Sequence, residues 1–407
     1  MTFFGFIIAV MYHLPSTALW SRIYIYIPIA LYLLDRILRT ALFTWMNLRI
    51  SRATLTPLEG GVTKVRLSNA ALKHWSPGAH VHLSIPHFGM IQSHPATIMS
   101  TPQSHDGDMV FLLKSHKGFT RRIMTSANNS ATALLPHTKQ ETREAQNAEV
   151  VRYRAMLNGP YGGSHSDLAA FDSVCLIAGS TGITFTLSVL LDIVDRATLS
   201  GKKLPVRRVH FVWCVKETSW TYWCQKELSS AIEKLTNAGI DAEVSVYVTC
   251  SDIFTEQSAD PKECGCTCDK SLGPCCCIVV DEDGEGLRDS DAIKPATSDT
   301  NAASGNATVT EKTGSLSSGP SQLEIGQQTA TRMPHLPRAA FYSGRPEMPE
   351  ILTRLLDGAD GESGVAVCGP IGLNSTVRKT VVRLSDRRAI HKGTGAQGCY
   401  LHVESYS

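Results

Sequence analysis

Residues 175–194, CLIAGSTGITFTLSVLLDIV, contain the turn best suited to bind an anion. Small and β-branched residues lead into a turn that Gly179 and Gly182 bracket, and apolar residues at helical spacing follow from Ile183. This pattern predicts a strand, a tight turn and a helix. The first N–H groups of a helix lack partners within it and lie at the positive end of its dipole, so the turn could hold a phosphate. The usual G-x-G-x-x-G spacing is absent, and the glycines could instead serve only to reverse the chain.

The overall composition excludes some partners. The chain has 407 residues, 43% of them hydrophobic, and a net charge of +2, with no stripe of basic and aromatic residues. We therefore expect room for two or three domains and no nucleic-acid partner. Twelve cysteines are present, and six of them fall between Cys264 and Cys277. Such close neighbours pair poorly as disulfides, which favours reduced thiols and a cytosolic location for this part.

The N-terminus is more apolar than the rest of the chain. Residues 3–12 and 23–34 are apolar runs, although neither reaches the roughly 20 residues of a clear membrane span. We interpret residues 1–46 as two membrane helices, with a signal peptide and a buried soluble hairpin as alternatives. Four arginines follow the start of the second run: Arg36, Arg39, Arg49 and Arg52. Their excess places the rest of the chain on the cytosolic side of the membrane.

The pattern of apolar residues changes near residue 172. Short, partly alternating segments between residues 50 and 155 predict a small antiparallel β-barrel. From Asp172 onwards strand and helix patterns alternate, which predicts a doubly wound parallel sheet. Two polar stretches, about 125–150 and about 252–335, lack enough apolar residues to offset the cost of ordering them. We expect both stretches to be mobile insertions.

Six short motifs occur in one order along the barrel and the sheet. They are SHPATIMS (93–100), KGFTRRI (117–123), NGPYGG (158–163), the GSTGIT turn (179–184), YSGRP (342–346) and VAVCGP (365–370). With the C-terminal HVESYS, this set resembles the ferredoxin–NADP⁺ reductase-like cytosolic half of the fungal ferric reductases, which are relatives of the NADPH oxidases. The resemblance implies membrane helices in residues 1–46, an FAD-binding β-barrel domain in 47–165 and an NADPH-binding α/β domain in 166–407.

The resemblance also assigns roles to individual residues. Those implied to hold FAD are His94, Pro95, Thr97, Ser100, Gly118, Thr120, Arg121, Gly159, Pro160, Tyr161 and Gly162. Those implied to hold NADPH are Gly179, Ser180, Thr181, Gly182, Ile183, Thr184, Cys368, Gly369 and Pro370. Cys368 would face the hydride, Glu404 would approach the nicotinamide and Tyr406 would shield the flavin. Cys368 as a small buried hydrophobe and Tyr406 as a loose terminal residue are the alternatives. Ala96 departs from the family pattern, which has an aromatic residue there.

The nicotinamide cofactor follows from charge at the end of the second sheet strand. NAD needs an acidic residue there, whereas the additional phosphate of NADPH needs a cation. The strand RRVHFVWCV is followed by Lys216 and then Glu217, and Arg345 could add a second positive contact. We therefore predict NADPH, with a solvated Lys216–Glu217 pair as the alternative.

Metal and haem binding are open from the sequence. The family's membrane helices hold haem b between paired histidines, and His13 stands where the last of these would be. We expect the other ligands to lie upstream in a full-length form, of which this chain is an N-terminally shortened version. The cluster CGCTCDKSLGPCCC lacks the spacing of a zinc site. Soft-metal binding, lipid attachment and inert thiols remain possible for Cys264–Cys277.

The sequence thus predicts a membrane-bound flavoprotein oxidoreductase, an NADPH-dependent ferric-chelate reductase. Electrons would pass from NADPH through FAD, and through haem in the full-length protein, to ferric chelates, in iron or copper uptake. We expect contact with membrane lipid, most simply at the plasma membrane, with the FAD and NADPH domains cytosolic. The alternatives are an NADPH oxidase that makes superoxide and a non-catalytic cysteine-rich metal-binding protein with a decayed flavin site.

Overall fold

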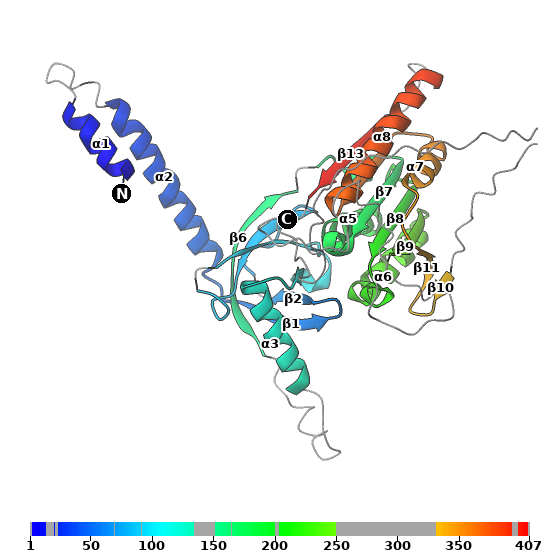
Figure 1. Cartoon of the computed structure of the whole chain (residues 1–407), viewed down its shortest axis with the longest axis horizontal. Helices are drawn as coiled ribbons and strands as arrows, with labels where there is room; N and C mark the ends of the chain where they lie inside the picture. The colour runs from blue at the N-terminus through cyan, green and yellow to red at the C-terminus, as the bar shows by residue number, and fades with distance from the viewer. Residues whose placement is uncertain are drawn as a thin grey trace, which may run out of the picture.

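The computed structural model describes residues 2–13, 20, 23–68, 70–90, 92–133, 151–163, 165–199, 203–249, 331–392 and 398–405. Figure 1 shows two N-terminal helices that lead to a β-barrel, and an α/β sheet domain that packs beside the barrel.

The first domain is a six-stranded antiparallel barrel, as the alternating segments predict. Its strand order is β4-β3-β6-β1-β2-β5. The alternation is clear in β3, where Ala79, Val81 and Leu83 are buried while His80 and His82 face outward. The strands are β1 (Ser51–Leu58), β2 (Val62–Ser68), β3 (Ala79–Ser84), β4 (His94–Thr97), β5 (Met109–Lys114) and β6 (Tyr153–Gly162).

Helix α3 (Phe119–Ala133) covers one side of the barrel. The prediction of a mobile insertion over about 125–150 is therefore wrong for its first residues. Residues 125–133 are helical rather than part of a mobile segment. Ile123 and Ala127 are fully buried against the barrel, and Ser126 Oγ lies 2.8 Å from Tyr153 Oη. This packing stabilises a helix whose Ser, Thr and Asn residues have weak helix propensity. Residues 134–150 lie outside the described residues.

The second domain is a seven-stranded sheet of order β10-β11-β9-β8-β7-β12-β13. Its strands are parallel except for β10, which forms an antiparallel hairpin with β11. The doubly wound sheet is therefore confirmed. The sequence did not predict the β10–β11 hairpin or the C-terminal strand. The strands are β7 (Ser173–Gly179), β8 (Arg208–Val215), β9 (Asp241–Val248), β10 (Thr331–Met333), β11 (Leu336–Ser343), β12 (Ser363–Cys368) and β13 (Cys399–Glu404).

Helices cover both faces of this sheet (Figure 1). They are α5 (Ile183–Leu199) and α6 (Gln225–Asn237) on one face, and α7 (Met348–Asp357) and α8 (Ile371–Lys392) on the other. The face under α5 and α6 shares a core with the barrel, since Val62 and Met99 belong to the same buried cluster as Phe185 and Trp213. Burying one such aromatic side chain is worth about 2–3 kcal/mol. The two domains therefore meet across an apolar interface.

Polar contacts fix how the domains meet. The Gly78 N–H donates to Ser188 Oγ on α5 at 2.7 Å, and Thr101 Oγ1 donates to Asp195 at 2.5 Å. Glu227 on α6 accepts from Lys64 Nζ at 2.6 Å and lies 3.2 Å from His105 Nε2. These bonds join β2, the β2–β3 connection and the β4–β5 connection of the barrel to helices α5 and α6.

The N-terminal residues form α1 (Thr2–His13) and α2 (Ile23–Met46), a helical pair that extends away from the barrel (Figure 1). No helix among the described residues is long and apolar enough to cross a membrane, so the prediction of membrane-spanning helices is not confirmed. In α2 the run of apolar residues is interrupted by Asp35, Arg36 and Arg39. The end of α2 is tied to β6, because the Asn47 side chain exchanges hydrogen bonds with the Leu157 backbone at 2.8 and 2.9 Å.

Candidate functional site

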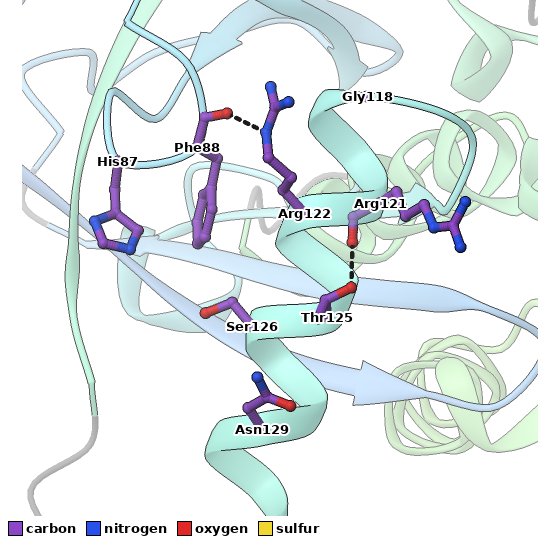
Figure 2. Close-up of a pocket in the computed structure, with 8 residues that line it drawn as sticks. All are labelled: His87, Phe88, Gly118, Arg121, Arg122, Thr125, Ser126 and Asn129. Carbon is purple, nitrogen blue, oxygen red and sulfur yellow. Dashed lines mark hydrogen bonds between the residues drawn. The ribbon is translucent and has the colours of Figure 1, made fainter.

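The start of α3 forms the rim of a cavity of about 460 Å³ on the barrel. Gly118 precedes the helix with φ +77°, a conformation that favours glycine. The Arg121 guanidinium extends away from the helix, whereas the Arg122 guanidinium donates to the Phe88 carbonyl at 2.5 Å (Figure 2). Arg122 also donates to Gln92 Oε1. The cavity is lined by His87, Phe88, Gly118, Arg121, Arg122, Thr125, Ser126 and Asn129. A helix N-terminus beside two arginines suits a phosphate group.

The hydroxyls of two predicted flavin residues are engaged within the barrel. Ser100 is fully buried; its Oγ donates to the Asp108 carbonyl at 2.8 Å and accepts from the Val110 N–H at 3.1 Å. Thr120 is 4% exposed and accepts from the His116 N–H at 2.9 Å. Ser100 therefore shapes the barrel wall, whereas Thr120 fixes the loop before α3 and keeps its own proton to donate.

Strand β4 carries the first predicted motif on its outer side. His94 and Thr97 are half-buried and Pro95 is exposed, and the His94 ring lies 6.4 Å from that of Phe119 at the start of α3. Ala96 is only 4% exposed and belongs to the barrel core. Its small side chain therefore faces the barrel interior.

The end of β6 presents an aromatic surface beside β3. Gly159 has φ +141° and precedes Pro160, and Gly162 has φ +74°. Tyr161 is 39% exposed and donates its hydroxyl proton to Asn158 at 2.7 Å. Two residues that sequence reasoning missed, His80 and His82, place their rings 6.0 and 5.9 Å from the Tyr161 ring. The period-two alternation of β3 was the signal that could have identified them.

The glycine-bearing turn packs directly against a second turn of the sheet. A Cβ on Gly182 would lie 2.1 Å from the Cys368 carbonyl oxygen, and a Cβ on Gly179 would lie 2.7 Å from Pro370 Cδ. These glycines are therefore required for close approach of the β7–α5 and β12–α8 turns. Gly369 is also close to its neighbours, since its Cβ would lie 2.8 Å from Leu373 Cδ2 and 3.2 Å from the Gly179 nitrogen.

The remaining residues of this turn form its short helical entry. Ser180 has φ +51°, and its carbonyl accepts from Trp213 Nε1 at 3.1 Å. Thr184 donates to the Thr181 carbonyl at 3.0 Å, and Ile183, fully buried, begins α5. The turn thus sets the first N–H groups of α5 at the carboxyl edge of the sheet.

Cys368 lies at this edge and is 3% exposed. Burial, with a smaller contribution from the charge of Glu404, raises the pKa of Cys368 to about 12. The thiol is therefore neutral near pH 7 and is no nucleophile. Glu404 lies beside it on the next strand, and Asn374 Nδ2 donates to the Glu404 carbonyl at 3.0 Å. Tyr406 lies outside the described residues.

Two lysines lie near the end of β8. Lys216 follows β8, and Lys114 ends strand β5 of the barrel. Burial, and then the charge of Lys216, lowers the pKa of Lys114, whose Nζ lies 5.0 Å from the centre of the Trp220 ring. The buried Trp220 Nε1 and Ser219 Oγ have no hydrogen-bond partner in the described structure. The two cations favour an anion at this point. Arg345 is exposed in the turn after β11.

Lys114 is a residue that the sequence did not single out. Nothing in the strand pattern of β5 indicates that its last residue meets the other domain. No group of three metal-ligating side chains occurs among the described residues, and Cys264–Cys277 lie outside them.

The residues present fit two anionic, ring-bearing cofactors. The helix starts at α3 and α5, with Arg121 and the two lysines, supply cationic or N–H donors for phosphates. The close turns at Gly182 and Cys368 leave no room for a side chain between them.

Comparisons with known proteins identify both domains. The ferric reductase NAD binding domain matches residues 171–382, and an FAD-binding domain matches residues 47–165. A probable cell surface ferric reductase, kap2, of Aspergillus oryzae is 28% identical over 219 residues, which are 50% of this chain and 26% of that protein. Respiratory burst oxidase homolog protein E of Arabidopsis thaliana is 21% identical over 270 residues, 58% of this chain and 27% of that protein. The chain thus spans about a quarter of the length of these relatives.

The chain also has a distant likeness to solved structures, at low identity and with TM-scores below 0.5. A flavohemoglobin from Malassezia yamatoensis with bound FAD and heme is 12% identical with a TM-score of 0.42, over 96% of this chain and 68% of that chain. A ferredoxin NADP⁺ reductase from Neisseria gonorrhoeae with bound FAD and NADP is 9% identical with a TM-score of 0.41, over 87% of this chain and 97% of that chain.

Proposed function

The chain belongs to the ferric reductase family, and from this premise we propose that it is an NADPH-dependent ferric-chelate reductase. The family assignment makes it a flavoprotein oxidoreductase with FAD-binding and NAD-binding domains. The observation that carries the finer proposal is the position of Lys216 directly after β8, with Lys114 Nζ 5.0 Å from the centre of the nearby Trp220 ring, since the ribose phosphate of NADPH needs a cation there.

The barrel residues would hold FAD. The α3 start with Gly118 and Arg121 would bind its diphosphate, and Thr120 would donate a hydroxyl proton to it. His94, Pro95 and Thr97 on β4, with Tyr161 after Pro160, would border its ring. Bound flavin supplies the conversion of a two-electron hydride into single electrons.

The sheet residues would orient NADPH. The α5 start, from Ser180 to Thr184, would bind its pyrophosphate, while Lys216, Lys114 and Arg345 would bind the ribose phosphate. Gly182, Cys368, Gly369 and Pro370 would shape the place of the nicotinamide, and the neutral Cys368 thiol excludes water without reacting.

The electron acceptor follows from the relatives. We propose a ferric chelate because a relative is named a ferric reductase, with dioxygen as the alternative that the respiratory burst relative suggests. We also propose a membrane location with the two cofactor domains in the cytosol, since another relative is named a ferric/cupric reductase transmembrane component.

Haem does not fit the N-terminal helices as they stand. The resemblance requires paired histidines, whereas α1 and α2 contain one, His13, which is exposed. No electron step in this chain is assigned to haem.

The test uses the full chain purified, loaded with FAD and examined by visible spectroscopy and NADPH oxidation. We expect flavin absorbance and NADPH-dependent reduction of ferric citrate. Lys216→Glu should raise the KM for NADPH by about tenfold or more, which corresponds to the loss of one charged hydrogen bond. The KM for NADH should change little. Lys226→Glu, an exposed lysine on α6, is the matched control.

Three results would contradict the proposal in different ways. Absence of flavin absorbance after loading would refute the proposal that the chain binds FAD. Equal losses with NADPH and NADH in Lys216→Glu would refute the account of phosphate recognition. Superoxide formation in place of ferric reduction would favour the oxidase alternative.

A further inference from the structure

His402 is the first residue of the C-terminal HVESYS segment, had no role assigned from the sequence, and lies beside the predicted hydride site. On β13 the side chains of Cys399, Leu401 and Val403 pack under α7 and α8, so those of His402 and Glu404 face the opposite side, with Cys368. His402 Nε2 lies 3.2 Å from Glu404 Oε2. The His402 side chain is 23% exposed and that of Glu404 is 46% exposed. The pair is thus partly shielded from water.

The His402 ring is fixed by two other elements. It stacks on Phe185 of α5, with centroids 5.4 Å apart and an interplanar angle of 22°. Its other neighbour is the His165 ring at 5.5 Å and 60°, on the linker after β6. His165 in turn places Nε2 3.1 Å from the Pro77 carbonyl and Nδ1 2.9 Å from the Ser166 carbonyl. Contacts from the barrel, the linker and α5 therefore determine where the His402 imidazole lies.

The Glu404 backbone is fixed as well. Glu404 is the Cα partner of Cys368 across the β12–β13 pair, and its carbonyl accepts from Asn374 Nδ2 at 3.0 Å. The Asn374 side chain is buried, and its Oδ1 has no hydrogen-bond partner in the described structure. With the backbone held on one side, the contact with His402 decides where the carboxylate points.

We propose that His402 is a positioning residue that holds the Glu404 carboxylate beside Cys368, and that protonation of His402 offsets the charge which this carboxylate presents to the nicotinamide. This inference rests on the proposed function. Hydride donation from NADPH leaves a positive charge on the nicotinamide ring, which a nearby carboxylate stabilises. A protonated His402 would reduce that stabilisation, so NADP⁺ should bind more tightly when His402 is neutral.

Among the described residues, few charged or titratable side chains face His402. Glu404 faces it from its own strand and His165 from the linker. Cys368 on β12 is neutral because burial raises its pKa, and the neighbour from α5 is the uncharged Phe185 ring. Tyr400, also on β13, is occupied by the Ser166 N–H at 3.0 Å.

The first test needs no cofactor. A double-mutant cycle with His402→Gln and Glu404→Gln is measured by urea unfolding of the full chain at about pH 6 and about pH 8. We expect the two residues to be coupled by about a two- to fivefold change in the unfolding constant at the lower pH, and by less at the higher. Equal coupling at both values, or none at either, overturns the ion pair.

The second test measures the ratio of the dissociation constants of NADP⁺ and NADPH across the same pH range. The ratio cancels titration of the phosphate that both nucleotides carry. We expect NADP⁺ to gain about threefold relative to NADPH on the alkaline side, and His402→Gln to remove this change. His105→Gln is the control, because His105 Nε2 also lies 3.2 Å from a glutamate, Glu227, away from the hydride site.

The outcomes separate the two proposals. A chain that binds both nucleotides with a ratio independent of pH, or a His402→Gln chain that keeps the wild-type change, overturns the role of His402 alone. A chain that binds neither nucleotide refutes the proposed function and this role together, while the unfolding cycle still decides whether the His402–Glu404 pair exists.

Discussion

The contact between Gly182 and Cys368 makes a sharp prediction for Gly182→Ala. The new Cβ would lie 2.1 Å from the Cys368 carbonyl oxygen, 2.7 Å from its carbon and 3.2 Å from its Sγ. Two of these atoms belong to the backbone at the end of β12, which cannot rotate away as a side chain would. The two turns must therefore separate by about 1 Å or more to restore ordinary contact distances. Overpacking of this kind costs about 1–3 kcal/mol, and a backbone obstacle favours the upper end.

The assay is urea unfolding of the full chain, followed by tryptophan fluorescence. Trp213 Nε1 donates to the Ser180 carbonyl at 3.1 Å, so a buried indole reports on this turn directly. We expect Gly182→Ala to lose about 3 kcal/mol of unfolding free energy and to weaken NADPH binding, because the α5 start moves with the turn.

Gly372→Ala is the matched control. Gly372 lies in the first turn of α8, near the same edge of the sheet, and a Cβ there meets nothing within 4 Å. Replacing a helical glycine by alanine should stabilise the chain by about 0.5–1 kcal/mol. If Gly182→Ala were as stable as Gly372→Ala, the close approach of the two turns would be wrong.

Three further predictions concern the domain interface and the site. Burial alone would raise the pKa of Glu227, but its bonds to His105 and Lys64 outweigh burial and hold the pKa at about 2. Because this lies below the value of about 4.3 in an unfolded chain, Glu227 stabilises the fold above that pH and the contribution is lost as the pH falls towards 2. Glu227→Gln should therefore cost about 3 kcal/mol in urea unfolding at pH 7 and much less near pH 2; an equal cost at both would contradict the ion pair. Iodoacetamide labelling read by mass spectrometry should modify half-buried Cys214 before Cys368, whose thiol burial keeps protonated, and the reverse order would show the sheet edge to be open. Lys114→Met should weaken NADPH binding about tenfold in fluorescence titrations while NADH binding changes little, and an unchanged NADPH constant would remove Lys114 from the site.

The sequence alone was sufficient to predict those strands and helices in which apolar and polar side chains alternate or repeat along the element. In β3 the order His80, Val81, His82, Leu83 shows an outer and an inner face without any structure. Helix α3 is different, because five of its eight residues beyond Thr125 are Ser, Asn or Thr, which are weak helix formers. The burial of Ala127 against the barrel stabilises it, and such a contact is not visible in local composition.

At the candidate site, too, the local sequence predicted the turn but not the contacts between segments that are distant in the chain. The turn at Gly182 was recognisable from its strand and helix, but only the ordered set of motifs decided in favour of phosphate binding over simple chain reversal. The structure adds a third reason, contact with Cys368, which lies far along the chain. Lys114 and Lys216 come together only because the barrel and the sheet dock, so neither segment alone could indicate their pairing.

These contacts also explain why the predicted hydride site needs both domains. Gly182 and Cys368 belong to the sheet, but the Phe185 ring behind them packs against the barrel loop at Gly78, where an added Cβ would lie 2.4 Å from that ring. A shift of the barrel would therefore move α5 and the turn that precedes it. Because reacting groups must be aligned to about 0.5 Å for efficient transfer, the docking contacts of the barrel belong to the alignment of the site as much as the turn residues do.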